Sequence, residues 1–467
     1  MQLTIYHTND LHSHFDKLAQ ISEYIRKNRT PGDLYLDSGD LCDLSDIMVQ
    51  GTEGKGAIHV LKGAGADAMA VGNNEIDLAK ELLEGCAAEG LPLLSCNVTD
   101  REGRETGNIR RSLLIERMGV RILVIGCSPY YGYQEETATF LPGKYNTFFE
   151  MGDLKTVEPE EQIRKELETY RGKYEFCILL SHSGFWIEEM LVKKIPEVDL
   201  CLGGHSHTVS CENRYLQNGC YGAYLGKVTL EIEDGKVQAV ATELLSTENF
   251  TEMDKTVLQA CETERKEAER MLDQTLYTVE ELPWDCEKEN LLTNLIADAL
   301  YAEYPCDLAF TNAGIVEGGI AGAVSKKKLV ELSPSKLNPT RFPVKGSALK
   351  QAVLHSFEAD FVRQQAPGAG VRWTVLGTLG FSHNVRIRKE PFAMYIDGKP
   401  LEEERIYMCV AHDALQRGTG YPELAVPDAD AEFFYGFIRD LLERTLQKKK
   451  IRELAGIKRR TERVEEG

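Results

Sequence analysis

Short apolar runs alternate with helical stretches through the first half of the chain, and no other feature limits the possible folds as strongly. Helical spacing of apolar residues appears, for example, at 17–28 and 77–90. Strands that alternate with helices pair in parallel, because the helix returns the chain to the same end of the sheet. The pattern therefore predicts an α/β fold with largely parallel strands. The apolar runs are 3–10, 34–40, 68–74, 91–98, 121–128, 176–184 and 198–207.

The chain of 467 residues is too long for one core, and its later segments differ from the first half. Two alternating runs flank Asp234-Gly235, which is a hairpin signal. A densely charged segment with helical spacing then precedes a second α/β region, in which 345–365 has helical spacing. The charged tail 446–467 predicts a helix or a frayed end with a solvated basic face. The predicted parts are a domain at 1–246, a linking helix at 247–275 and a second domain at 276–467.

Composition narrows the class of partner. The formal net charge is −20, which argues against nucleic acid, although a small anion can bind where cations are held inside a site. The start MQLTIYHTND shows no secretory signal, and no apolar run approaches the ~20 residues of a membrane span. The 12 cysteines are scattered without a C-x-x-C pair, which favours reduced thiols over disulfides or thiolate zinc sites. We therefore expect a cytoplasmic protein without a membrane or nucleic-acid partner.

Polar residues of metal-binding types stand at the carboxyl ends of five apolar runs. In open α/β sheets these ends share one edge, where loops converge into sites. Taken singly, such residues are usually structural: an aspartate caps a turn, and a histidine in an apolar strand is a core residue. His7, His14 and His59 are best explained in that way. The joint candidates are Asp10, His12, Asp40, Asn73, His182, His205 and His207.

These seven side chains point to two metal ions. Carboxylates, imidazoles and one amide suit manganese, iron, cobalt or zinc. Seven ligands are too many for one tetrahedral ion, but they suit two ions that share a carboxylate. Two ions roughly 3.5–4 Å apart can hold the entering and leaving oxygens of a phosphoryl displacement. Neighbouring glycines let the backbone turn and leave room for a substrate.

The motifs also resemble a known family. Asp10-x-His12, Gly39-Asp40, Gly72-Asn73-x-Glu75, Ser181-His182-x-Gly184 and Gly-Gly-His205-x-His207 occur in order. This resembles the calcineurin-like metallophosphoesterases, and more narrowly the bacterial 5′-nucleotidase, UDP-sugar hydrolase and 2′,3′-cyclic phosphodiesterase family. The resemblance implies an amino-terminal αββα dimetal sandwich, a linking helix and a carboxyl-terminal α/β nucleotide-binding domain.

The resemblance implies a role for each ligand. Asp10, His12, Asp40 and His207 would hold one ion, and Asp40, Asn73, His182 and His205 would hold the other, with Asp40 bridging. A metal-bound water would attack phosphorus in line.

One position in this centre departs from the family. The loop there usually reads Gly-Asn-His-Glu, and its histidine, oriented by an aspartate three residues later, stabilises the phosphoryl group or assists the leaving oxygen. Here that histidine is Asn74, while Asp77 keeps the partner position. An amide can donate a hydrogen bond to a phosphate oxygen, but it cannot carry a proton to a leaving alkoxide. This favours substrates with better leaving groups, such as phosphoanhydrides.

The second domain departs more from the family. Asn312 opens a motif that lacks the usual arginine, and the stacking aromatic of a later motif is replaced by Ala414. Asn312, Arg341, Arg417 and Tyr421 are the candidate substrate-binding residues, although Arg341 and Arg417 are equally well explained as surface cations.

Three functions compete. The leading one is 5′-nucleotidase-like hydrolysis of a small phosphorylated substrate, a nucleotide or its derivative. The second is a phosphodiesterase or pyrophosphatase acting on cyclic or sugar nucleotides. A non-catalytic metal- or ligand-binding regulator is the third, which the complete ligand set argues against.

Overall fold

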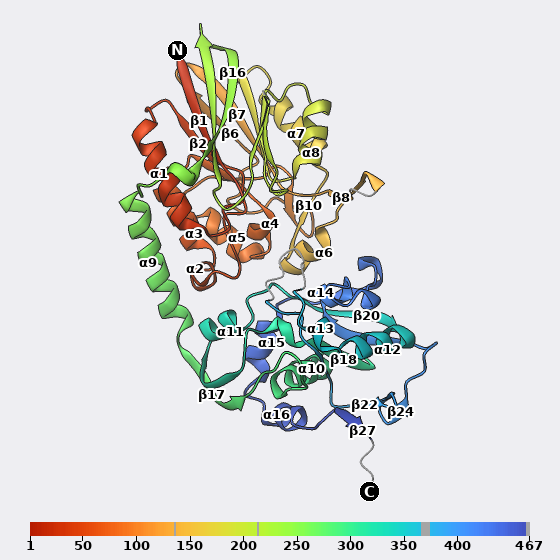
Figure 1. The fold of residues 1–467 in the computed structure, drawn as a ribbon. Helices are drawn as coiled ribbons and strands as arrows, with labels where there is room; N and C mark the ends of the chain where they lie inside the picture. Colours follow the sequence, from red (N-terminus) through yellow and green to blue (C-terminus); the bar gives the residue numbers. More distant parts are fainter. Residues whose placement is uncertain (135–136, 213, 366–373, 464–467) are drawn as a thin grey trace. The chain divides into compact units, whose positions relative to one another are not determined.

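The computed structural model describes residues 1–134, 137–212, 214–365 and 374–463. The chain divides into two compact units, Met1–Met271 and Leu272–Gly467 (Figure 1). Helix α9 (Lys255–Leu272) lies within the charged segment 247–275, and the division between the units falls at its carboxyl end. No helix among the described residues is both long and apolar enough to cross a membrane.

The first unit contains two six-stranded sheets. In the first sheet four strands are parallel, and an antiparallel pair flanks them on one side only; in the second sheet four parallel strands lie between two antiparallel edge strands. The first sheet has the order β16 (Lys236–Ser246), β15 (Tyr224–Glu233), β1 (Gln2–Thr8), β2 (Leu34–Asp37), β3 (Ala68–Ala70) and β4 (Leu93–Leu94). The second has the order β13 (Val209–Glu212), β14 (Tyr215–Asn218), β12 (Leu200–Leu202), β11 (Phe176–Ser181), β7 (Val120–Cys127) and β6 (Ser112–Arg117).

The two sheets pack against each other through fully buried aliphatic side chains, among them Ile5 and Leu36 from the first sheet and Val124 and Ile178 from the second. Helices cover the outer faces (Figure 1). Those beside the first sheet are α1 (Phe15–Asn28), α3 (Lys55–Gly63) and α5 (Lys80–Ala87), and those beside the second are α7 (Pro159–Thr169) and α8 (Phe185–Lys194). This is the predicted αββα sandwich.

Short elements complete the first unit. They are α2 (Ile47–Gly51), α4 (Asn73–Ile76), α6 (Asn146–Phe149), the pair β5 (Val98–Asp100) and β10 (Leu154–Thr156), and the hairpin β8 (Gly132–Gln134) and β9 (Thr139–Leu141). The predicted hairpin is confirmed as β15–β16, and its turn residues Asp234 and Gly235 have left-handed φ angles of 51° and 70°. That conformation is what an Asp-Gly turn favours.

The second unit is α/β, but most of its strand pairs are antiparallel. The five-stranded sheet has the order β21 (Leu379–Phe381), β18 (Leu308–Asn312), β25 (Ile406–His412), β20 (Pro339–Lys345) and β26 (Glu432–Phe433). The four-stranded sheet has the order β24 (Lys399–Pro400), β23 (Ala393–Ile396), β22 (Val385–Glu390) and β27 (Arg460–Arg463), and β17 (Thr275–Leu282) pairs with β19 (Ile320–Ser325). The helices are α10 (Leu291–Glu303), α11 (Lys326–Leu332), α12 (Gly346–His355), α13 (Ala359–Val362), α14 (Asp413–Gln416), α15 (Ile438–Thr445) and α16 (Lys449–Ala455).

Two local predictions for this unit were incomplete. The helical segment 345–365 contains two helices, α12 and α13, with a break after His355. The tail is more than a helix with a solvated face: after α16 it forms β27, parallel to β22. Arg459 and Arg460 are buried there, Arg459 in an ion pair with Asp298, so tertiary partners compensate charges that the sequence assigns to solvent.

Candidate metal centre

The five predicted loops meet at the carboxyl ends of parallel strands. Asp10 follows β1, Asp40 follows β2, and Asn73 opens α4 after β3. His182 follows β11, and the loop after β12 carries His205 and His207. The alternation of strands and helices brings these loops together, although the first and last are far apart in the sequence.

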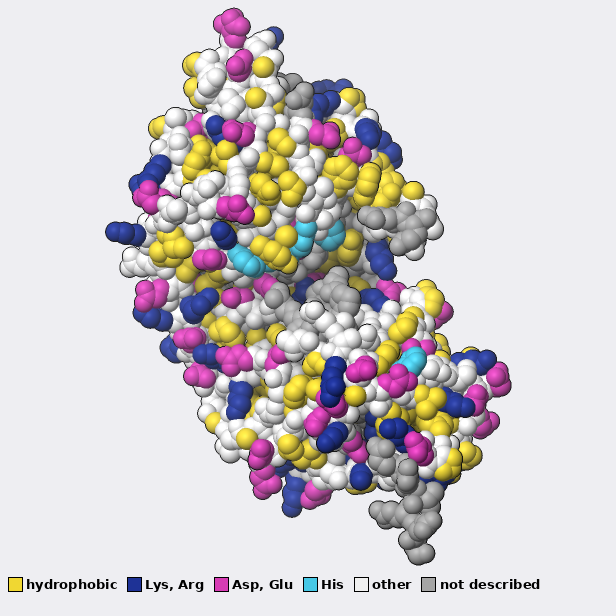
Figure 2. Space-filling view, viewed as in Figure 1, with side chains coloured by type: hydrophobic (Ala, Val, Ile, Leu, Met, Phe, Trp, Pro, Cys, Tyr) yellow, Lys and Arg dark blue, Asp and Glu magenta, His cyan; other side chains and the backbone are white. Residues whose placement is uncertain are grey.

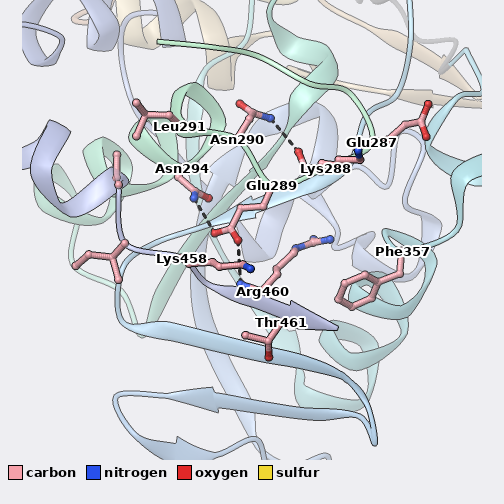
Figure 3. Close-up of a pocket in the computed structure, with 13 residues that line it drawn as sticks. Glu287, Lys288, Glu289, Asn290, Leu291, Asn294, Phe357, Lys458, Arg460 and Thr461 are labelled. Atoms are coloured by element: carbon pink, nitrogen blue, oxygen red, sulfur yellow. Dashed lines mark hydrogen bonds between the residues drawn. The ribbon is translucent and has the colours of Figure 1, made fainter. Parts of the chain in front are cut away.

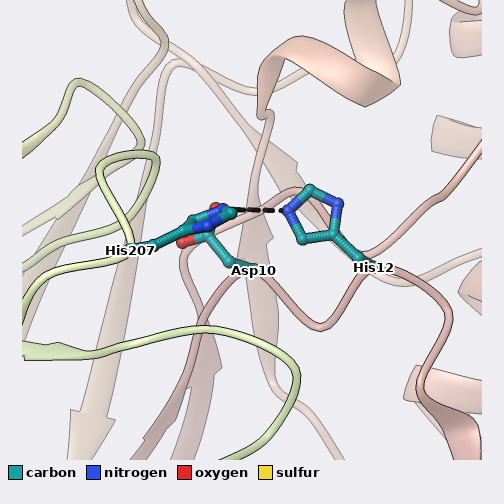
Figure 4. A group of neighbouring side chains, drawn as sticks. All are labelled: Asp10, His12 and His207. Atoms are coloured by element: carbon teal, nitrogen blue, oxygen red, sulfur yellow. Dashed lines mark hydrogen bonds and ion pairs between the residues drawn. The ribbon is translucent and has the colours of Figure 1, made fainter. Parts of the chain in front are cut away.

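Asp10, His12 and His207 form one group (Figure 4). The Nε2 atoms of the two imidazoles lie 3.1 Å apart, and Oδ1 of Asp10 lies 3.3 Å from His207 Nε2 and 3.7 Å from His12 Nε2. Histidine side chains reach the surface of this unit (Figure 2). The side chain of His12 is 14% exposed and that of His207 38%, so solvent or a ligand can approach the group.

Asp10, Asp40 and His182 form the second group. Nε2 of His182 lies 3.3 Å from Asp40 Oδ1 and 3.8 Å from Asp10 Oδ1. The other oxygen of Asp40, Oδ2, lies 3.9 Å from His12 Nε2, so this carboxylate faces both groups. Beside them, Asn73 Oδ1 is 2.8 Å from His205 Nδ1. The structure thus gathers all seven predicted ligands, with Asp40 between the two groups.

The backbone that presents these ligands is strained. Positive φ angles cost a non-glycine residue about 1–2 kcal/mol each, and they persist where the surroundings impose them. Five of the seven have them: Asp10 (49°), His12 (43°), Asp40 (53°), His205 (72°) and His207 (55°). Close packing also requires glycine, because a Cβ atom on Gly72 would lie 2.3 Å from Asp40 Oδ1. This concentration of strain marks a site shaped for binding rather than for stability.

Two buried ligand atoms have no hydrogen-bond partner among the described residues, Asp10 Oδ1 and His182 Nε2. Both side chains are fully buried. His182 Nδ1 donates to the Ser38 carbonyl at 2.7 Å, so the neutral ring presents the lone pair of Nε2 to the site. An unsatisfied buried polar atom costs about 1–3 kcal/mol. A cation between these two atoms would satisfy both, and the residues therefore fit a metal.

The pKa values of the centre are also consistent with a bound cation. Burial lowers the pKa of His182, but the carboxylates of Asp40 and Asp10 outweigh burial and raise it to about 10. Burial raises the pKa of Asp10 and Asp40, but the His182 imidazole outweighs it, and both pKa values lie below the usual range. The pKa of His205 falls to about 4 through burial and the neighbouring His182. The buried carboxylates thus favour positive charge at the centre, whether a proton or a cation.

Two buried glutamates fix the loops, and the sequence assigned a role to neither. Glu75 accepts backbone N–H bonds from Gly72 at 3.0 Å, Asp40 at 2.9 Å and Cys42 at 3.0 Å. Glu188 accepts from the N–H groups of Ser183 at 3.0 Å and Gly204 at 3.3 Å, which joins the His182 and His205 loops. The sequence signal that could have identified Glu188 was a carboxylate on the apolar, buried face of the helix 185–194.

Two tyrosines were also missed. The Tyr145 hydroxyl lies 2.8 Å from His205 Nε2. The exposed ring of Tyr221 contacts three imidazoles, with ring centroids 4.6 Å from His14, 5.6 Å from His12 and 5.8 Å from His207. Nothing in the spacing of the sequence connects these tyrosines to the histidines.

Asn74 is 6% exposed and bonded within the protein. Its N–H donates to Asp40 Oδ1 at 2.8 Å. Its amide nitrogen donates to the Cys42 carbonyl at 2.7 Å and lies 3.0 Å from His12 Nδ1. One amide hydrogen therefore has a protein acceptor, the Cys42 carbonyl, and the amide nitrogen also contacts the ring of His12. Asp77 follows α4 and its N–H donates to the Asn73 carbonyl at 2.8 Å.

The four candidates in the second unit have protein partners. Asn312 and Tyr421 are fully buried, and they donate to the adjacent carbonyls of Leu376 and Gly377. Arg341 pairs with Glu432. Arg417 lies 3.1 Å from Asp413 and 3.2 Å from Asp428. As they lie, the two buried side chains stabilise the unit, and a role in substrate binding stays a prediction for all four.

A cavity of about 460 Å³ in the second unit lies elsewhere (Figure 3). Glu289 organises it, accepting from the Asn294 amide at 2.8 Å and from the N–H of Arg460 at 3.0 Å. The four candidates are not among its lining residues, which are Glu287, Lys288, Glu289, Asn290, Leu291, Asn294, Phe357, Ala455, Gly456, Ile457, Lys458, Arg460 and Thr461.

Comparison with known proteins identifies both units. The calcineurin-like phosphoesterase family matches residues 3–209, and the 5′-nucleotidase C-terminal domain matches residues 276–425. An uncharacterised metallophosphoesterase of Bacillus subtilis, YunD, is 27% identical over 94% of this chain and 98% of its own length. The trifunctional nucleotide phosphoesterase YfkN of the same organism is 27% identical over 71% of this chain, which spans 26% of that longer relative.

Solved structures agree in fold. The NAD nucleotidase of Haemophilus influenzae is similar with a TM-score of 0.62 at 15% identity, over 96% of both chains. With the two family matches and the clustered ligands, this leads to one conclusion. The chain belongs to the calcineurin-like metallophosphoesterases that carry a 5′-nucleotidase C-terminal domain, and it is a hydrolase of phosphate esters.

Proposed function

We propose that the protein hydrolyses nucleotides or nucleotide derivatives with two divalent metal ions bound in the first unit. Asp10, His12, Asp40 and His207 would hold one ion, and Asp40, Asn73, His182 and His205 the other. The observation that carries this proposal is the pair of buried ligand atoms without partners, Asp10 Oδ1 and His182 Nε2. The mixture of carboxylate, imidazole and amide ligands is suited to manganese, iron, cobalt or zinc.

When bound, two such ions supply Lewis acidity and lower the pKa of water. The residues of the chain orient the ligands and hold the loops that carry them. Asp40 offers one oxygen to each group, and Ser38 fixes the His182 ring in the orientation that turns Nε2 inward. Glu75 and Glu188 keep the loops in register through their backbone hydrogen bonds. The strained, preformed loops mean that little reorganisation remains for the reaction itself.

The leaving group is the point at which this site differs from its family. Asn74 cannot protonate a leaving alkoxide, and its amide nitrogen already donates to the Cys42 carbonyl. A nucleoside diphosphate or pyrophosphate leaves with less need for a proton than an alcohol does. We therefore propose phosphoanhydrides, such as sugar nucleotides, as better substrates than nucleoside monophosphates, and cyclic nucleotides as the second candidate class.

The proposal also includes the cellular compartment and the class of partner. Twelve cysteines are free, which supports a reducing compartment such as the cytoplasm. The net charge of −20 supports a small phosphorylated molecule rather than nucleic acid as the partner.

The test starts from purified, manganese-loaded protein. We expect about two ions per chain by elemental analysis and hydrolysis of an aryl phosphate, with faster turnover of a UDP-sugar than of a nucleoside monophosphate. Asp40→Asn should lose both bound metal and turnover. A clear preference for the monophosphate contradicts the leaving-group argument alone, whereas metal-free, inactive wild-type protein contradicts the proposal as a whole.

A further inference from the structure

Tyr145 stands at the metal centre without any assigned role. It lies between β9 and α6, and its ring packs at right angles to the ring of His205, with centroids 5.2 Å apart. The neighbouring Asn146 exchanges hydrogen bonds with the backbone of Thr156 at 2.8 and 2.9 Å, which fixes this segment. These hydrogen bonds fix the position of the Tyr145 hydroxyl beside His205.

The hydrogen bonds of His205 determine what that hydroxyl can do. Nδ1 lies 2.8 Å from Asn73 Oδ1, and Nε2 lies 2.8 Å from the Tyr145 oxygen. An amide oxygen only accepts, so the single hydrogen of the neutral ring is on Nδ1. Nε2 must then accept from Tyr145, and the hydroxyl hydrogen is used in that bond.

This arrangement reverses if His205 and Asn73 hold the same ion, an assumption that rests on the proposed function. His205 then uses its Nδ1 lone pair for the ion, and its hydrogen moves to Nε2. Nε2–H donates to the Tyr145 oxygen, which leaves the hydroxyl hydrogen available for another acceptor. The acceptor that such a site receives is a phosphoryl oxygen.

We propose that Tyr145 is the hydrogen-bond donor that this chain offers to the phosphoryl group of its substrate, in place of Asn74. The amide nitrogen of Asn74 donates to the Cys42 carbonyl and packs against His12 Nδ1, so this side chain is already engaged within the protein. Tyr145 approaches from a different segment, between the strand 139–141 and the helix 146–149. The residue at the family position contacts His12, and the proposed donor comes from a different segment and contacts His205.

The experiment compares Tyr145→Phe with Tyr133→Phe in the full, manganese-loaded chain. Tyr133 is a matched control, because its ring packs on Phe140 and Trp186 with centroids 5.2 and 5.3 Å away. Calorimetric titration with inorganic phosphate measures binding without turnover, and elemental analysis measures bound manganese. We expect Tyr145→Phe to keep the metal content of the wild type and to bind phosphate about ten- to a hundredfold more weakly, the usual cost of one hydrogen bond to a charged group.

Tyr133→Phe should match the wild type in both measurements. Unchanged phosphate binding in Tyr145→Phe would overturn the proposal. Loss of manganese in parallel with phosphate would also overturn it, because Tyr145 would then act only by positioning His205. A wild type that binds no manganese would instead refute the proposed function, which keeps the two failures distinct.

Discussion

Each unit of the molecule buries a histidine at the end of a central strand, and the two rings are used differently. Among the residues that the structure describes, none is a hydrogen-bond partner of His182 Nε2 in the first unit, and the pKa of His182 is raised to about 10, because the carboxylates of Asp40 and Asp10 outweigh burial. In the second unit, His412 donates from Nε2 to Asn312 at 2.7 Å, and burial lowers its pKa to about 3. A protein satisfies its own buried polar atoms unless a ligand will do so. This difference supports the proposed ligand role of His182 in the first unit, whereas His412 is bonded within the second unit.

The largest expected effect separates these two histidines by substitution. His182→Gln should lower the rate of phosphoester hydrolysis by about 10²–10⁴-fold, the range for a group lost from the reacting centre. It should also reduce bound manganese, because a ligand is lost. His412→Gln should reduce the stability of the second unit but keep the metal content. Elemental analysis and initial rates on an aryl phosphate decide the comparison, and equal loss of metal in both variants would contradict it.

Metal removal should act on one unit only. A ligand at a thousand times its dissociation constant stabilises the folded state by about 4 kcal/mol, and here all ligand residues lie in the first unit. Chelation should therefore speed amide exchange in the strands of 1–271 and leave those of 272–467 unchanged. Hydrogen exchange followed by mass spectrometry resolves the two sets of peptides. Equal acceleration in both units would show that the metal is not confined to the first.

The smallest expected effect is a pH dependence of the metal-free first unit. The pKa of His182 is about 10 when folded and ~6.5 when unfolded, so its stabilising contribution is complete below pH ~6.5 and declines as the pH rises toward 10. Above pH 7, the His182 proton by itself should make the free energy of unfolding fall by roughly 1 kcal/mol per pH unit, and cysteine thiols that ionise in the unfolded chain add to this fall as the pH approaches ~8.5.

Urea unfolding in the presence of a chelator measures this slope. His182→Gln should remove the His182 contribution and so make the slope shallower, since no proton is then released at that position. His412 should contribute no slope in this window, because its ring is neutral in both the folded and the unfolded chain. A slope in His182→Gln as steep as that of the wild type would assign the pH dependence to other groups.

The alternation of strands and helices was enough to predict an α/β fold with largely parallel strands and the edge at which the ligand types gather, and the resemblance to a known family implied the αββα arrangement. The hairpin at Asp234-Gly235 was also predictable, because its turn is formed by two neighbouring residues. The structure of the tail could not be predicted in this way. Its charged residues predicted a solvent-exposed face, but Arg459 and Arg460 are buried and bind residues of distant segments. A charged residue is expected at the surface unless an opposite charge is near in sequence, and here the carboxylate that pairs with Arg459, Asp298, is 161 residues away.

The sequence by itself determined which side chains could bind metal and that they would share one edge of the sheets. Only the tertiary structure decided how the atoms around them are used. It shows that the amide of Asn74 is bonded to Cys42 and His12, and that Tyr145 reaches His205. The reason is physical: residue type and strand order follow from local rules, whereas a hydrogen-bond partner depends on which distant segment packs beside it.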